Sequence, residues 1–260
     1  MTPDDAQLPH DLAELIGSCT WQATSGCSGA AVYRLTRPNG SQLYLKCGAD
    51  EPDRRLADEC AKLLWLAGKL PVPQVYYFNQ SGGISYLLMS AIPGQDTSDR
   101  AYEQDVPAMV RQLAQALRLV HSVPINGCPF NERLAVKLAR ASRRTAAGLV
   151  DTAEFGEQFH GKSAGEWLAE LESGRAGEED LVFTHGDYCL PNVLLQAGQL
   201  SGFIDLGSAG VADRYQDLAL GARSLARNFG AEWIPLFFAA YGIEAEPHKV
   251  IYYQLLDEFF

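Results

Sequence analysis

The stretch "FTHGDYCLPNVLL" places His185, Asp187 and Asn192 between two apolar runs. One interpretation is a hairpin connection in which Gly186 and Asn192 supply the turn geometry. The other is a catalytic loop that carries a base and a metal ligand. The choice constrains the whole chain, because a catalytic loop of this kind requires partner residues on other elements.

A second polar turn follows in "SGFIDLG", where Asp205 ends an apolar strand ahead of Gly207. Phosphoryl transfer needs a carboxylate that orients and deprotonates the attacking hydroxyl, and oxygen ligands for the metal that neutralises the triphosphate. The spacing H-x-D-x-x-x-x-N followed by D-x-G resembles the catalytic and metal loops of protein kinases. Neither motif decides alone, but the two in this order, between strand-like runs, favour a kinase.

A kinase also needs a lysine on an early strand and a helical glutamate that holds it. Lys46 ends the strand-like run "LYLK", and Glu59 lies on the next helical stripe between Leu56 and Leu63. A carboxylate on an inward stripe costs several kcal/mol unless it is paired, and Lys46 is the natural partner. Taken singly, each could equally be a snorkelling or surface residue. Tyr44 shares a strand face with Lys46 and could stack on a base or be a plain core tyrosine.

Two further segments are candidates for nucleotide contacts. The loop "SGCSGA" precedes a strand and could present backbone N–H groups and the Ser28 hydroxyl to phosphate, although it lacks G-x-G-x-x-G and could be a simple hairpin turn. The apolar "YLLMSAIPG" reads as a last strand followed by a hinge. The backbone from Ser90 to Ile92 could there pair with adenine.

The pattern along the chain predicts an α+β fold with a small β-rich lobe and a larger helical lobe. Strand-like runs "AAVYRLT", "SQLYLKC" and "ISYLLMS" fill the first third, interrupted by a helix over roughly 53–67. Helices are expected over 108–121, around 131–148, and from 217 onward, with strands at "DLVFTH" and "GFID". We expect lobes at 1–91 and 99–260, joined by a linker at 92–98.

Composition excludes several classes. A net charge of -11 over 260 residues leaves no basic stripe for nucleic acid, although acidity of this size suits a cationic ligand or a solvated surface. The N-terminal segment is not a signal peptide, and no apolar run has the length of a membrane span. Six scattered cysteines predict small buried apolar groups in a reducing cytosol rather than a zinc site or disulfides.

The residues above, with "LVDTAEFGEQFHG", "SGFIDLGSAGVADRYQDLAL" and "LLDEFF", make nearly the full chain resemble the aminoglycoside 3'-phosphotransferase (kanamycin kinase) family. The resemblance implies a protein-kinase-like two-lobed fold and a cytoplasmic bacterial enzyme, monomeric or weakly dimeric. The implied cofactors are ATP and Mg²⁺. The implied reaction transfers the γ-phosphate to the 3'-hydroxyl of kanamycin- and neomycin-type antibiotics, conferring resistance, with no nucleic-acid or membrane partner.

Carried over by position, Asp187 resembles the catalytic base, Asn192 and Asp205 the metal ligands, and Lys46 with Glu59 the phosphate-positioning pair. Tyr44 matches an adenine-stacking residue, and Ser28 lies in the nucleotide loop. The drug-binding positions of the family fall on Glu154, Glu157, Arg223, Asp257, Glu258 and the terminal carboxylate of Phe260.

Three positions depart from the family pattern. Ser208 stands where close relatives carry arginine, Gly156 replaces an acidic or amide residue, and Asn228 replaces an acid. These departures bear on the drug profile rather than on the chemistry. Two alternatives remain: a kinase of the same fold acting on choline, a sugar or a macrolide, and a catalytically dead kinase-like binding module. The second would require loss of a lysine, base or metal ligand, and all are present.

Overall fold

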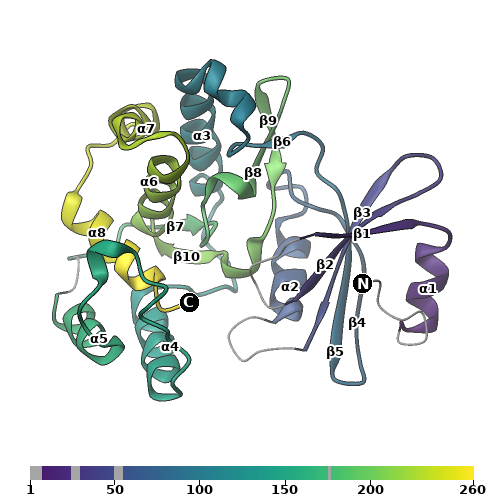
Figure 1. Ribbon diagram of the computed structural model, residues 1–260, viewed down its shortest axis with the longest axis horizontal. Coiled ribbons are helices and arrows are strands. Elements are labelled where there is room, and N and C mark those ends of the chain that lie inside the picture. The colour runs from purple at the N-terminus through teal and green to yellow at the C-terminus, as the bar shows by residue number, and fades with distance from the viewer. Residues whose placement is uncertain (1–7, 25–29, 50–54, 175–176) are drawn as a thin grey trace. The chain divides into compact units, whose positions relative to one another are not determined.

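The structure is a computed structural model that describes residues 8–24, 30–49, 55–174 and 177–260 (Figure 1). The chain forms two compact units. The first, here called the N-terminal unit, comprises residues 1–93 and 202–207. The second, the C-terminal unit, comprises residues 94–201 and 208–260.

The N-terminal unit is built on one antiparallel sheet of five strands in the order β1-β2-β3-β5-β4. The strands are β1 (Thr20–Thr24), β2 (Ala31–Thr36), β3 (Gln42–Gly48), β4 (Val75–Ser81) and β5 (Ile84–Ser90). Alternation along β3 divides its side chains between the two faces. Leu43 and Leu45 are buried on one face, whereas Tyr44 and Lys46 point to the other.

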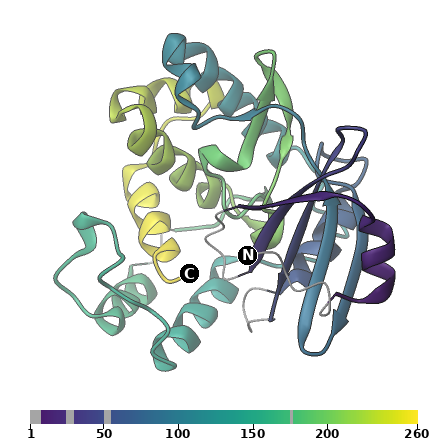
Figure 2. The same cartoon turned by 45° about the vertical axis from the view of Figure 1, so that its right-hand side comes forward.

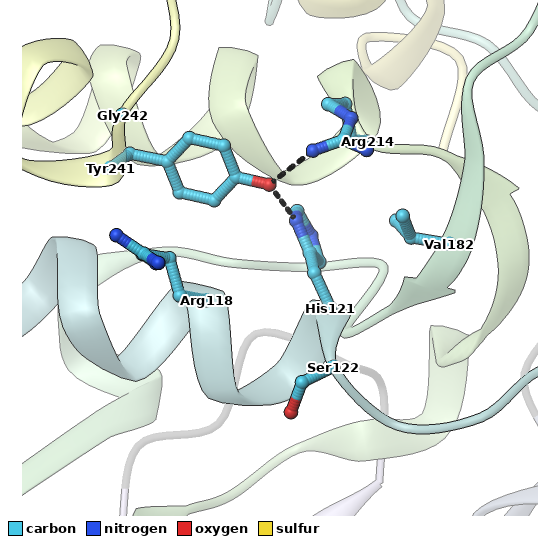
Figure 3. A pocket seen from close by; sticks show the side chains of 7 residues that line it. All are labelled: Arg118, His121, Ser122, Val182, Arg214, Tyr241 and Gly242. Atoms are coloured by element: carbon cyan, nitrogen blue, oxygen red, sulfur yellow. Dashed lines mark hydrogen bonds between the residues drawn. The ribbon is translucent and has the colours of Figure 1, made fainter.

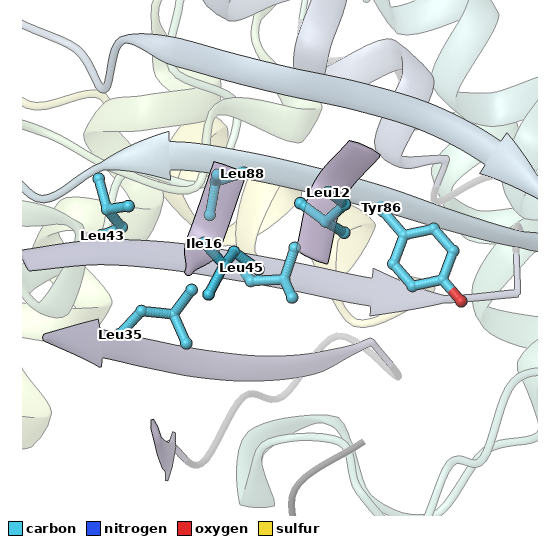
Figure 4. Close-up of a cluster of buried hydrophobic side chains, with 7 residues drawn as sticks. All are labelled: Leu12, Ile16, Leu35, Leu43, Leu45, Tyr86 and Leu88. Atoms are coloured by element: carbon cyan, nitrogen blue, oxygen red, sulfur yellow. The ribbon is translucent and has the colours of Figure 1, made fainter. Parts of the chain in front are cut away.

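The leucine face of the sheet packs against α1 (His10–Ile16), as Figure 4 shows. Leu12 and Ile16, one helical turn apart, meet the leucines of β2, β3 and β5 in a single apolar cluster. The members of this cluster are Leu12, Ile16, Leu35, Leu43, Leu45, Tyr86 and Leu88. The opposite face therefore remains for polar side chains, including Lys46.

Helix α2 (Leu56–Leu66) packs on β4 and β5 and supplies the residues that meet this polar face. Its stripe of Leu56, Cys60 and Leu63 is buried. The helix begins at Leu56 and ends before Ala67, so it is shorter than the predicted 53–67; residues 53 and 54 lie outside the described residues.

The chain returns to the N-terminal unit at residues 202–207. The Phe203 N–H donates to the Pro71 carbonyl at 2.9 Å, and a Cβ on Gly202 would lie 2.5 Å from the same oxygen. Glycine thus permits a close backbone approach here. The division into 1–91 and 99–260 that we expected is contiguous, because local sequence patterns do not show that a later segment packs back on the first unit.

The C-terminal unit is mostly helical. Its helices are α3 (Val106–His121), α4 (Leu134–Ala146), α5 (Ala164–Ser173), α6 (Tyr215–Phe229), α7 (Ile234–Tyr241) and α8 (Pro247–Asp257). Two small sheets accompany them: β7 (Leu181–Thr184) pairs with β10 (Gly210–Asp213), and β6 (Gln95–Asp96), β8 (Val193–Gln196) and β9 (Gln199–Phe203) form the other. In Figures 1 and 2, α8 is the yellow helix; it packs on α6, α4 and α5.

Local sequence explains where these helices begin. Asp105 caps α3 by accepting from the Ala108 N–H, and a proline occupies its first turn, so α3 starts at Val106 rather than at 108. The predicted helix around 131–148 is shorter, because Asn131 forms a β-bridge with Val211 and α4 starts only at Leu134.

The α+β class with an N-terminal antiparallel sheet and a larger helical unit is therefore confirmed. The α-helices and strands that were not expected from the sequence are α1, α5, β1, β4, β6, β8 and β10. The cysteine prediction is wrong in part: of the described cysteines only Cys60 is buried, and Cys19, Cys47, Cys128 and Cys189 are partly exposed. In the described residues, no helix is both long enough and apolar enough to span a bilayer.

Candidate active site

Lys46 stands between two carboxylates of the N-terminal unit. Its Nζ lies 2.7 Å from Glu59 Oε1 and 2.6 Å from Asp205 Oδ1. The Lys46 and Glu59 side chains are only 10% and 7% exposed, whereas that of Asp205 is 47% exposed. The pair that the sequence predicted is formed, and Asp205 joins it from a turn 159 residues further along the chain.

The charge state of Lys46 follows from these neighbours. Burial alone would lower the pKa of the Lys46 ammonium, but the carboxylates of Glu59 and Asp205 outweigh it and raise the pKa well above its ordinary value. Lys46 is therefore a permanent cation on β3, paired with the buried Glu59 carboxylate.

Asp205 lies just after β9 in a left-handed backbone conformation, with φ +59°. Aspartate tolerates this region better than most residues, and non-glycine residues held there often mark functional sites. The following turn is fixed by α2, because the Lys62 ammonium donates to the Gly207 carbonyl at 2.6 Å. Helix α2 thus holds both Lys46, through Glu59, and the turn that carries Asp205.

The other nucleotide candidates receive mixed support. Tyr44 is half-buried on the same face of β3 as Lys46. The Ser90 N–H donates to the Gln74 carbonyl at 2.9 Å, whereas the Ile92 N–H has no partner within the described part of the chain. Pairing of the backbone from Ser90 to Ile92 with adenine stays a prediction. Ser28 lies outside the described residues.

In the C-terminal unit, Asp187 and Asn192 lie side by side after β7. The Asn192 amide donates to the Asp187 backbone carbonyl and to its carboxylate Oδ2, both at 3.0 Å. Asn192 is buried and Asp187 is half-buried. This arrangement fixes the carboxylate and turns the Asn192 Oδ1 oxygen, an acceptor, away from the shared hydrogen bonds.

Asp217, in the first turn of α6, holds the loop that carries Asp187 through hydrogen bonds to the loop backbone. The fully buried Asp217 carboxylate accepts the backbone N–H of His185 at 2.7 Å and of Gly186 at 2.8 Å. His121, at the end of α3, lies 3.0 Å from the same carboxylate through Nε2. Gly186 has φ +85°, and a Cβ there would lie 2.0 Å from the Ser208 carbonyl oxygen, so only glycine fits this turn.

Two further hydrogen bonds anchor the same loop. The fully buried Tyr188 hydroxyl donates to the Leu113 carbonyl of α3 at 2.7 Å, and the Leu190 N–H donates to the Ser224 hydroxyl of α6 at 3.0 Å. The loop is therefore fixed by both α3 and α6. A plain hairpin connection would not need such anchoring.

An acidic pair lies at the end of α8. Arg223 of α6 forms ion pairs with Asp257 and with Glu258, the latter at 3.0 Å. Burial alone would lower the pKa of Arg223, but Asp257 and Glu258 raise it, and the charge of Asp187 contributes in the same direction. The acidic pair therefore lies within electrostatic range of the Asp187 loop.

The insert that carries Glu154 and Glu157 is tied to this acidic pair. The Gly156 N–H donates to Glu258 Oε2 at 3.3 Å, and the Phe155 ring packs edge-to-face on Phe259. Glu154 and Glu157 are exposed on either side of this contact. The Phe260 ring lies beneath two cations of α4, with its centroid 5.5 Å from Lys137 Nζ and 5.9 Å from Arg140 Cζ.

Two of the three departures have a structural account. A Cβ at Gly156 would lie 3.0 Å from the Gln158 amide, a flexible neighbour, so this position accepts other residues. Asn228 is exposed and its amide donates to the Ser224 carbonyl of its own helix. Nothing in the contacts of the Ser208 side chain explains a serine there.

Sequence reasoning missed Asp217, His121 and Lys62. An acid inside the apolar run "YQDLAL" and a lysine one turn after Glu59 were the available signals, because buried charges of this kind need partners. Their partners are the backbone groups of loops 31 to 145 residues away, which no local pattern identifies.

Comparison with known proteins identifies the family. The sequence pattern of the phosphotransferase enzyme family matches residues 21–253. An aminoglycoside 3'-phosphotransferase from Niallia circulans is 41% identical over 263 residues, covering 100% of both chains.

Solved structures give the same result. A crystal structure of an aminoglycoside 3'-phosphotransferase of type VIII superimposes with a TM-score of 0.87 at 36% identity, covering 96% of this chain and 97% of that one. An aminoglycoside phosphotransferase from Streptomyces rimosus, in complex with ADP and streptomycin, superimposes with a TM-score of 0.82 at 29% identity and 95% coverage of each chain. Together with the kinase-like order of its loops, these likenesses show that the chain is an enzyme of the aminoglycoside 3'-phosphotransferase family.

Proposed function

We propose that this protein transfers the γ-phosphate of ATP to the 3'-hydroxyl of kanamycin- and neomycin-type aminoglycosides. The observation that carries the proposal is the acidic pair Asp257–Glu258, held by Arg223 within electrostatic range of Asp187. A polycationic acceptor bound at these acids would lie near the base. Choline, sugars and macrolides carry too little positive charge to need them.

Asp187 acts as the base and orienter of the acceptor hydroxyl. Its carboxylate is held by the Asn192 amide, so one oxygen is fixed and the half-buried group keeps access to a ligand. A positioned carboxylate lowers the barrier by aligning the hydroxyl and accepting its proton as the bond to phosphorus forms. The Asp217 anchor keeps this group in place through the loop backbone.

Lys46 positions the ATP phosphates while Glu59 holds its ammonium. Asn192 and Asp205 are suited to Mg²⁺, because amide and carboxylate oxygens are its preferred ligands and one or two carboxylates suffice when phosphates complete the shell. Bound Mg²⁺ would neutralise charge on the triphosphate.

The drug would bind through Asp257, Glu258, Glu154 and Glu157, with Phe260 beside them. We place the reaction in the bacterial cytoplasm, where ATP is supplied, and infer that drug modification there confers resistance. The exposed position of Glu154 and Glu157 on either side of the Gly156–Glu258 contact supports a wall of acids that converge on one ligand.

A coupled ADP-release assay tests the proposal. Kanamycin and neomycin should stimulate ADP release, whereas choline and erythromycin should not, and NMR of the kanamycin product should locate the phosphate on the 3'-oxygen. Stimulation by choline or erythromycin alone would reject the proposed substrate class.

Tobramycin is the matched control for regiochemistry. It carries the amines of kanamycin but lacks the 3'-hydroxyl, so it should bind as a competitive inhibitor against kanamycin without being phosphorylated. Rapid phosphorylation of tobramycin would show that Asp187 activates a different hydroxyl.

A further inference from the structure

Tyr241, near the end of α7, lies in the wall of a cavity of about 360 Å³ in the C-terminal unit (Figure 3). The cavity is lined by Arg118, His121, Ser122, Val182, Arg214, Tyr241 and Gly242. Within the described residues, Arg118 is the only polar side chain of this lining without a hydrogen-bond or ion-pair partner. The other polar groups are used by the protein itself, so this wall is an internal network rather than a ligand site.

The network runs from the cavity to the catalytic loop. Arg214 Nη1 donates to the Tyr241 hydroxyl at 2.9 Å, and that hydroxyl lies 2.7 Å from His121 Nδ1. His121 Nε2 lies 3.0 Å from Asp217, whose carboxylate accepts the two loop amides described above. At the end of the network opposite Asp217, Asp180 forms an ion pair with Arg214, and its Oδ2 lies 2.6 Å from Arg214 Nε.

The direction of each hydrogen bond follows from which groups can only donate or only accept. Arg214 only donates, so the Tyr241 oxygen accepts from it and its single proton is available to His121 Nδ1. The carboxylate of Asp217 only accepts, so His121 must carry its proton on Nε2. Burial raises the pKa of Tyr241, against the opposing effect of Arg214, so the hydroxyl stays protonated and can donate.

We propose that Tyr241 is a positioning residue for the catalytic loop. Its hydroxyl donates to His121 Nδ1 and so stabilises the Nε2-protonated tautomer that Asp217 requires, and that N–H holds the Asp217 carboxylate in the orientation that binds the His185 and Gly186 amides. The proposal rests on the assignment of this loop as catalytic. It gives α7, which supplies no residue to the candidate active site, a defined part in turnover.

Tyr241→Phe tests the proposal, because it removes the hydroxyl and keeps the ring that packs edge-to-face on His121. Loss of one such hydrogen bond is worth about 1 kcal/mol, so kcat should fall roughly three- to tenfold. KM for ATP and for kanamycin should change by less than about twofold, since neither ligand meets Tyr241.

Tyr252→Phe is the matched control. The Tyr252 hydroxyl is buried and donates to the Leu171 carbonyl at 2.8 Å, so its loss should lower Tm about as much as the loss of the Tyr241 hydroxyl does. We expect kcat to be unchanged in Tyr252→Phe. An equal fall of kcat in both variants, or no fall in Tyr241→Phe, would overturn the proposal.

A double-mutant cycle tests the route through His121. In the His121→Ala background, Tyr241→Phe should have no further effect on kcat, whereas full additivity would reject the proposed coupling. Hydrolysis of ATP in the absence of drug, followed as ADP release, should depend on the same loop and gives a second readout of it. Tyr241→Phe and Tyr252→Phe can therefore be compared even if kanamycin proves not to be the acceptor.

Discussion

Lys46 in the N-terminal unit and Arg223 in the C-terminal unit each stand between two carboxylates. Each cluster carries one positive and two negative charges, a net charge of −1. The first belongs to the proposed site of an anion, the ATP triphosphate, and the second to the proposed site of a polycationic drug. The same composition therefore meets ligands of opposite sign.

In both clusters the most exposed member is a carboxylate, so the difference lies in what that carboxylate binds. Lys46 and Glu59 are both buried, and the exposed member of their cluster is Asp205, which we assign to the metal. A triphosphate approaching this cluster meets a net negative charge, so it needs Mg²⁺ as well as Lys46. A drug approaching Asp257 and Glu258 meets attraction from the start, because Arg223 neutralises only one of the two acids.

The side chains suit these tasks. The forked guanidinium of Arg223 can hold two carboxylates in fixed directions at once. The compact ammonium of Lys46 can release Asp205 and turn to a phosphate while it keeps Glu59. The second cluster is thus a prebuilt acidic wall, and the first is an ion pair with an exchangeable third member.

The largest effect should come from Asp187, which belongs to neither cluster. Asp187→Asn keeps the size and the polar contacts of the side chain but removes the proton acceptor. We expect kcat to fall by roughly two to four orders of magnitude, the usual worth of a positioned base. Binding of ATP and of kanamycin, measured by calorimetry, should be nearly retained. Turnover near the wild-type rate would show that chemistry is not located in this loop.

The next effect separates the two clusters. Lys46→Met removes the cation between Glu59 and Asp205, and we expect kcat/KM for ATP to fall about a hundredfold, with kanamycin binding unchanged. Breaking the buried Lys46–Glu59 pair should also lower the free energy of unfolding by roughly 3–5 kcal/mol.

The double variant Lys46→Met/Glu59→Gln distinguishes stability from function. It removes the uncompensated buried charge, so most of the lost unfolding free energy should return while activity stays low. Recovery of activity together with stability would mean that Lys46 is structural only.

The sequence was sufficient for the Lys46–Glu59 pair because both sides of it are local: a strand ending in lysine, and an acid on the inward stripe of the next helix. It was also sufficient for the neighbouring Asp187 and Asn192, whose separation within one loop is short. The β-rich and helical parts followed from the change of periodicity after residue 92.

The rest depends on contacts that the local sequence does not encode. The seven-residue α1 is too short for a clear period, yet Leu12 and Ile16 complete the apolar face of the sheet. Asp217 reads as one acid in an apolar helix until the loop amides that it binds are placed beside it. The predicted start of this helix near Asn131 was wrong, because Asn131 forms a β-bridge with Val211 and α4 begins only at Leu134.

A smaller effect tests the acidic wall. Glu258→Gln and Asp257→Asn should each raise KM for kanamycin about tenfold, because each removes one charge worth roughly 1–2 kcal/mol in a partly solvated site. KM for ATP should not change. Glu14→Gln, an exposed acid on α1 of the N-terminal unit, is the control for net charge alone. If Glu14→Gln raises KM for kanamycin as much, the protein attracts the drug only through its overall charge.

The smallest effect is the pH dependence of drug affinity. Burial raises the pKa of Glu258 above its ordinary value of 4.5, although Arg223 opposes the shift. Because the folded-state pKa is raised, protonated Glu258 favours the folded state at low pH, and this contribution is lost as pH rises through the folded-state pKa. The drug needs the ionised form, so its binding must release a proton in the same range.

KM for kanamycin should therefore fall a few-fold as pH rises above 4.5, the ordinary pKa of a glutamate, because the drug amines stay protonated there. Glu258→Gln should flatten this part of the profile, while KM for ATP keeps its wild-type shape. The Lys46 cluster offers the contrast, since the pKa of Lys46 is raised and its charge persists throughout this range. A kanamycin profile that is unchanged in Glu258→Gln would show that Glu258 braces Arg223 without meeting the drug.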